Sequence, residues 1–261
     1  MLPLLAGLLV GTFEEWFQWF IPARVGDVRD IFLNGVAISC GLLFSLALEP
    51  PERFTRTLTR ASLRRIGAFA SVTLIVFAAF YDSVQVGYAV EGQGWRFKSC
   101  YTAARLDALA AERAARWRNS FVPRPPRLSA EDQYMTEGLW HVQRRNRAWD
   151  AGDVRTAWRE NQILERHFAP VLDTPSYVSK SGHRWPGDHR ADAERRFQEA
   201  QSAGGAAAAE YESDAHPAAI HAWPKAIYWS IAGVLALLLA LPALLRAGRQ
   251  ETTNAPRHEA I

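Results

Sequence analysis

The sequence predicts an all-α integral membrane protein with about four transmembrane helices and an extracytoplasmic, mainly helical domain inserted before the last span. Four runs approach the roughly 20 apolar residues that a helix needs to cross a bilayer, at 2–21, 31–48, 67–90 and 226–245. The section between the third and fourth runs is rich in Arg, Asp and Glu. Several of the ten Trp flank the apolar runs, where amphipathic rings favour the headgroup level of a membrane.

The four apolar runs differ in how clearly they predict a span. The third and fourth are the clearest, with LIVFAAF and GVLALLLALPALL at their centres. The first carries Glu14 and Glu15 close to its end, and the second is short. A secretory signal peptide is the alternative for the first run, but this run has neither a basic start nor an obvious small-residue cleavage site before Glu14.

Basic residues in short loops predict the orientation, because such loops stay in the cytoplasm. The link between the second and third runs holds five of them: Arg53, Arg56, Arg60, Arg64 and Arg65. We therefore expect a protein integral to the bacterial cytoplasmic membrane, with both termini cytoplasmic and residues 91–223 outside. Residues 224–247 form the last helix in this scheme, and residues 248–261 a disordered cytoplasmic tail.

The polar section 91–223 shows helical periodicity over most of its length. Helices are expected over 98–118, from about 130 to 149, over 154–168 and over 188–203. The sequence Ala151-Gly152-Asp153 predicts a tight turn between the second and third of these helices. Apolar residues at three- and four-residue spacing then predict an antiparallel helical hairpin at 129–168, which could offer a surface to a partner protein.

A polar constellation lies between the first two apolar runs. Glu15 and Gln18 share one helix face, Asp30 and Asn34 share another, and Arg24 lies in the loop between them. An ionisable group at membrane depth is a functional candidate by default, and the Arg24 fork suits a carboxylate or a phosphate. We expect these five residues to bind a ligand. In the structural alternative, Asp27 caps the second helix, Asp30 completes an acidic first turn and Glu15 pairs with Arg24.

The same positions resemble the signature of the VanZ-like family of bacterial membrane proteins, named for a teicoplanin-resistance accessory protein. The matching order is an acid-x-x-Gln, a Pro-x-Arg loop, and Asp-x-x-x-Asn-Gly: Glu15, Gln18, Pro22, Arg24, Asp30, Asn34 and Gly35. The resemblance implies a VanZ-like core at residues 1–90, an envelope role and a link to antibiotic resistance, without implying a reaction. Members usually have further spans before the acidic helix, so a reduced or N-terminally truncated core is expected.

The residues favour a non-enzymatic protein that binds a membrane lipid or a lipid-linked envelope precursor. The alternative is an intramembrane enzyme that acts on a lipid-linked substrate, with Glu15 or Asp30 as acid or base. A third interpretation makes the apolar helices a passive anchor for the outer domain. No cofactor or metal is expected, because the chain has two Cys and lacks the His-Glu-x-x-His, Gly-x-Ser-x-Gly and phosphate-loop motifs. The expected extracytoplasmic position of the polar domain also argues against nucleic acid.

Overall fold

The chain divides into two compact units in a computed structural model that describes residues 1–21, 24, 26–50, 59–119, 130–176, 179–202, 210–217 and 219–244. The helical unit comprises Met1–Gln18, Gly26–Ser83 and Pro224–Ile261. The α/β unit comprises Trp19–Val25 and Val84–Trp223. The predicted linker at 122–126, the low-complexity stretch at 204–209 and the tail at 248–261 lie outside the described residues.

The helical unit contains α2 (Val28–Leu48) and α9 (Lys225–Leu244), together with most of α1 (Leu2–Phe20) and most of α3 (Arg60–Gln85). Its part of α1 ends at Gln18, and its part of α3 ends at Ser83. In the described part of the chain, α2 and α3 are long and apolar enough to cross a membrane, whereas α9 has a shorter apolar stretch. Only 6% of the apolar window of α2 and 17% of that of α3 are buried. The core helix of a soluble protein would be mostly buried, so these two helices present their apolar side chains outward.

Small residues bring α1 and α2 close together. A Cβ placed on Gly7 would lie 2.9 Å from Ile38 Cδ1, and one on Gly35 would lie 3.0 Å from Leu8 Cδ2. These pairs run in opposite order along the two helices, so α1 and α2 are antiparallel. Close approach through small residues is the usual way for helices to associate in a membrane, where apolar burial supplies little driving force.

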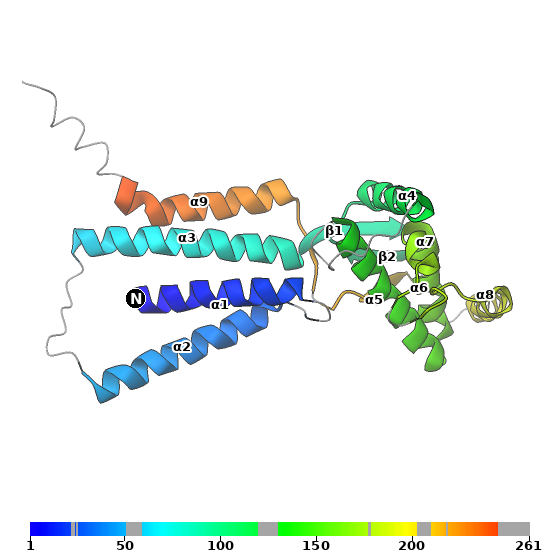
Figure 1. The fold of residues 1–261 in the computed structure, drawn as a ribbon, viewed down its shortest axis with the longest axis horizontal. Helices are drawn as coiled ribbons and strands as arrows, with labels where there is room; N and C mark the ends of the chain where they lie inside the picture. The colour runs from blue at the N-terminus through cyan, green and yellow to red at the C-terminus, as the bar shows by residue number, and fades with distance from the viewer. Residues whose placement is uncertain are drawn as a thin grey trace, which may run out of the picture. The chain divides into compact units, whose positions relative to one another are not determined.

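Helices α3 and α9 run beside each other (Figure 1) and are joined near one end by polar contacts. The Tyr228 hydroxyl donates a hydrogen bond of 2.7 Å to the Ala78 carbonyl oxygen. Lys225 Nζ lies 3.0 Å from Asp82 Oδ1, and the rings of Tyr81 and Tyr228 stack at 6.1 Å. These contacts fix the start of α9 against the end of α3.

The α/β unit contains a four-stranded sheet that the sequence analysis did not predict. Its order is β3 (Tyr211–Ser213), β2 (Trp95–Ser99), β1 (Val86–Gly92) and β4 (His221–Ala222). Strands β1 and β2 form an antiparallel hairpin that turns at Gly94, where φ is +75°, while β3 and β4 are parallel to their neighbours. The third predicted span therefore ends at Gln85 instead of residue 90. The helix expected from Lys98 begins only after β2, because Trp95, Phe97 and Ser99 alternate inward as in a strand.

The remaining elements confirm that the protein is mostly helical. The predicted helical hairpin is present, with a turn at Gly152 (φ +76°) and with Asp153 capping the second helix through a 3.0 Å bond from the Thr156 N–H. Apolar side chains from β1, β2, β3 and four of the helices form one core, in which Phe97, Leu106, Ile163 and Phe168 are buried. The helices of this unit are α4 (Ala103–Asn119), α5 (Ala130–Asp150), α6 (Val154–His167), α7 (Ala169–Asp173) and α8 (Gly187–Ser202).

Substituting Gly87 with Ala should destabilise the α/β unit. A Cβ at Gly87 would lie 2.2 Å from the Ser99 carbonyl oxygen, and a backbone atom within the sheet cannot rotate away. We expect a loss of about 1–3 kcal/mol and a lower midpoint in thermal unfolding followed by circular dichroism. The control is Gly187→Ala, because a Cβ there has no neighbour within 4 Å. Equal midpoints for the two variants would contradict the close approach of β1 and β2.

Candidate functional site

The structure brings three of the polar residues between α1 and α2 together. Glu15, which is only 3% exposed, accepts a bond of 3.3 Å from Gln18 Nε2 and one of 3.5 Å from the Asp27 N–H. The Asp27 side chain in turn accepts a bond of 2.9 Å from the Arg29 N–H. The structural alternative that Asp27 caps α2 is therefore confirmed. Glu15 ties the end of α1 to the start of α2.

The other candidate residues are placed differently. Asp30 is exposed in the first turn of α2. Asn34 is half-buried and packs near Gly11, whose added Cβ would lie 3.6 Å from Asn34 Nδ2. Arg24 is exposed and belongs to the α/β unit, where its N–H donates to the Ile21 carbonyl oxygen at 3.1 Å. Ligand binding by these residues remains a prediction.

A groove of about 790 Å³ lies within the helical unit. It is lined mainly by α1, α2 and α3, with Leu239 from α9. Thr12, Val28 and Ile31 belong to its lining and lie within four residues of Glu15, Asp27 or Asp30 along the chain. One part of this apolar groove therefore lies close to the polar constellation.

A buried carboxylate organises the α/β unit. Glu160 on α6 is fully buried, and its Oε2 lies 2.6 Å from His141 Nδ1 on α5. Its Oε1 accepts bonds of 2.5 Å from the hydroxyls of Tyr211 and Ser213 on β3. Although burial opposes ionisation, His141 and the two hydroxyls hold the pKa of the Glu160 carboxyl below its ordinary value. One ionised group thus joins two helices and a strand.

Sequence analysis missed this network, although a signal was present. On α6 the three- and four-residue spacing of Ala157, Glu160, Asn161 and Leu164 places an ionisable residue on the face that packs against the rest of the unit. His141 occupies the same kind of position on α5. A Glu in the buried stripe of a helix needs a partner from elsewhere in the fold, and that requirement could have marked Glu160.

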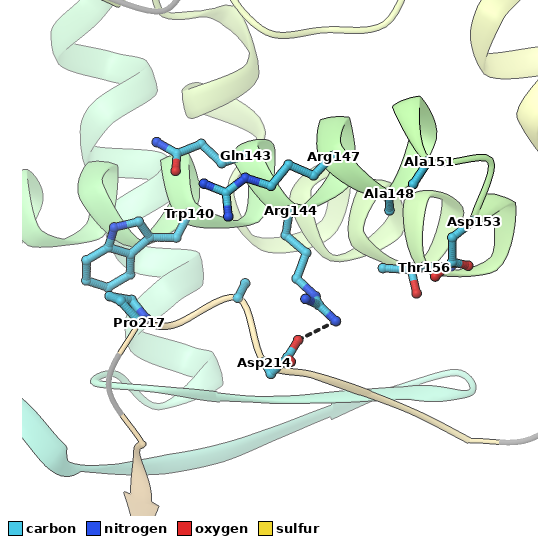
Figure 2. Close-up of a pocket in the computed structure, with 11 residues that line it drawn as sticks. Trp140, Gln143, Arg144, Arg147, Ala148, Ala151, Asp153, Thr156, Asp214 and Pro217 are labelled. Carbon is cyan, nitrogen blue, oxygen red and sulfur yellow. Dashed lines mark hydrogen bonds and ion pairs between the residues drawn. The ribbon is translucent and has the colours of Figure 1, made fainter.

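Beside this network lies a groove of about 450 Å³, which we call the α5 groove. Figure 2 shows Trp140, Gln143, Arg144 and Arg147 on α5, the start of α6, and the segment after β3 on the opposite side. Arg144 Nη2 lies 2.5 Å from Asp214 Oδ1, which ties this segment to α5. The groove is lined by Trp140, Gln143, Arg144, Arg147, Ala148, Ala151, Asp153, Thr156, Asp214, Ala215 and Pro217.

A second buried acid on α5 lies at a much smaller cavity of about 20 Å³. Glu137 is bonded to the Ser99 hydroxyl and the Cys100 N–H, whereas its Oε1 has no hydrogen-bond partner in the described part of the chain. Burial raises the pKa of the Glu137 carboxyl to about 7, more than these bonds lower it. A cavity of this size has room for one water molecule.

Comparisons with known proteins give no relative for this chain: no family model, no curated protein and no solved structure matches it. The resemblance to the VanZ-like family therefore remains a prediction that depends on the seven spaced residues alone.

Glu137 should make the protein less stable as the pH rises from about 4.5 to about 7. Because its folded-state pKa of about 7 lies above the ordinary value of 4.5, the folded protein holds this proton more tightly than the unfolded chain. The stabilisation is complete below about pH 4.5 and is lost by about pH 7, where ionisation in the folded state costs up to ~3 kcal/mol.

Thermal unfolding of native protein and Glu137→Gln at pH 5 and pH 8 tests this dependence. The amide oxygen can still accept the bonds from Ser99 and Cys100, and it carries no charge at either pH. We expect the variant to gain stability over the native protein at pH 8 and much less at pH 5. A difference between the two proteins that does not change with pH would contradict the raised pKa.

Proposed function

We propose that the chain is an integral protein of the bacterial cytoplasmic membrane whose helical unit binds a lipid with a sugar or polyol headgroup. The lipid is either a membrane lipid or a lipid-linked envelope precursor. The observation that carries the proposal is the apolar groove of about 790 Å³ whose lining includes neighbours of Glu15 and Asp27. The proposed topology keeps both termini in the cytoplasm and residues 91–223 outside.

The lining of the groove fits a hydrocarbon chain. Most of its residues are apolar, including Leu4, Leu8, Val36 and Phe77. Its three hydroxyl side chains already donate to backbone carbonyl oxygens of their own helices, at distances of 2.8 to 2.9 Å: Thr12 to Leu8, Ser39 to Gly35, and Thr73 to Phe69. The hydroxyl protons are therefore engaged inside the protein, and apolar contact is what the groove offers to a ligand.

The polar constellation fits a headgroup with several hydroxyls. Glu15, Asp27 and Asp30 are hydrogen-bond acceptors, and sugar or polyol hydroxyls are donors. Non-enzymatic binding is the function we propose, and the α5–α6 hairpin would offer its surface to a partner protein.

Filling the groove should remove the bound lipid. Ser39 is a small residue of the lining, so Ser39→Phe would place a ring where the chain lies. We expect the purified variant to carry much less lipid than native protein when extracted lipids are quantified by mass spectrometry. Leu43→Phe is the matched control, because Leu43 lies one turn further along α2, is 67% exposed and is not part of the lining.

The headgroup part of the proposal has its own test in the same preparation. Asp30→Asn should weaken the binding of glucosyl-diacylglycerol about tenfold, because a hydrogen bond to a charged acceptor is lost. Binding of diacylglycerol, which lacks the sugar, should not change. Glu14→Gln is the control, since Glu14 is exposed on α1 and changes the same charge. Lipid retention that is equal in native protein, Ser39→Phe and Leu43→Phe would refute the groove as a lipid site.

A further inference from the structure

We propose that the α5 groove is a second binding site, which takes a saccharide with a carboxylate group. This inference concerns the α/β unit alone and does not rest on the lipid proposed for the helical unit. The volume of about 450 Å³ lies within the range of small-molecule sites in proteins.

Two guanidinium groups and two carboxylates line the groove, and Arg147 is the group that offers a contact to an anion. Asp214 is paired with Arg144, and Asp153 accepts the Thr156 N–H as the cap of α6. Arg144 is further engaged by Tyr211, whose hydroxyl lies 3.5 Å from its Nε, and by Glu160 at 3.7 Å. Arg147 is exposed and makes no hydrogen bond or ion pair with the described residues. Arg147 therefore leaves a guanidinium for a ligand, and its planar fork matches the two oxygens of a carboxylate.

The other side chains of the lining fit a sugar ring. Trp140 is half-buried and offers part of an amphipathic ring surface, while its contact with the His216 ring at 4.4 Å holds it in place. The Gln143 amide and the Thr156 hydroxyl also make no side-chain hydrogen bond with described residues, so they are available to sugar hydroxyls. An aromatic surface beside a few convergent polar groups is a common arrangement in ligand sites.

Trp140 and Arg147 are the aromatic and the cationic side chain between which the ligand would lie. They are seven residues apart on α5 and line the same groove. The Arg147 side chain extends along α5 toward Gln143 (Figure 2). A saccharide with one ring on Trp140 would therefore present its carboxylate to Arg147, and an acidic disaccharide is the probe for this arrangement.

The walls of the groove are held in place before any ligand binds. The segment after β3 forms one wall, and it is tied to α5 by Asp214 and to the buried Glu160 by Ser213. The other walls are α5 and α6, which form the helical hairpin. A site with fixed walls loses less entropy on binding than one that must first be ordered.

Isothermal titration calorimetry of the purified full-length protein tests the proposal with two disaccharides. One is glucuronic acid linked to N-acetylglucosamine, and the other is chitobiose, which has the same number of rings and no carboxylate. We expect native protein to bind the acidic disaccharide at least about tenfold more tightly, because a charge-assisted hydrogen bond is made with only one of them. Arg147→Gln should abolish this preference.

Two further variants complete the design. Lys180→Gln removes one positive charge from an exposed position outside the groove and should keep the preference. Trp140→Leu should weaken both disaccharides, because it removes the aromatic surface and leaves the charge. Equal affinity of native protein for the two disaccharides, no measurable binding of either, or a preference that survives in Arg147→Gln would each overturn the proposal.

Discussion

The arrangement of the α/β unit depends on the buried carboxylate of Glu160. An ionised group without solvent is tolerated only when its partners replace water, and removing a partner from a buried pair costs about 3–5 kcal/mol. Glu160 meets this requirement with His141 from α5 and with two hydroxyls from β3. These partners come from segments that are far apart in the sequence, so satisfying one charge fixes the positions of two helices and a strand.

The exposed ion pairs of β3 are too weak to replace this anchor. Glu212 pairs with Arg96 and Lys98 on β2, but all three side chains are 40–47% exposed. Exposed ion pairs contribute about 0–1 kcal/mol each. Strand β3 is only three residues long, and its position follows from its backbone pairing with β2, from Glu160 and from the packing of Tyr211 in the core. The segment that forms one wall of the α5 groove begins where this strand ends, so the buried network around Glu160 also helps to fix the position of that wall.

Local signals were sufficient to predict much of the helical structure. Gly152 and Asp153 mark a turn and a helix cap whose chemistry acts within a few residues, and the hairpin that they separate was predicted correctly. The sheet was missed because β1 continues an apolar run that reads as the end of a membrane helix. After Gly94, apolar and basic residues alternate from Trp95 to Lys98, which is a strand signal. It was missed because the next helix was expected to begin at Lys98.

The sites were less accessible to sequence analysis than the helices. Glu15, Gln18 and Asp27 do come together, because they flank one short connection. The α5 groove contains the ion pair of Arg144 and Asp214, and a pairing over such a distance in the chain follows from the tertiary fold alone. Buried ionisable residues within helical stripes, such as Glu137 and Glu160, were the available signal for that fold.

The central claim is that Glu160 holds β3 and the groove wall in place, and hydrogen–deuterium exchange of residues 211–215 tests it most directly. In native protein the Tyr211 N–H bonds to the Gly94 carbonyl oxygen and the Ala215 N–H bonds to the Ser213 hydroxyl, so both amides should exchange slowly. Glu160→Met keeps a side chain of similar length and removes the oxygen that accepts the Tyr211 and Ser213 hydroxyls. The account predicts much faster exchange of these amides in the variant, while α4 keeps its protection. Unchanged exchange at residues 211–215 would contradict it.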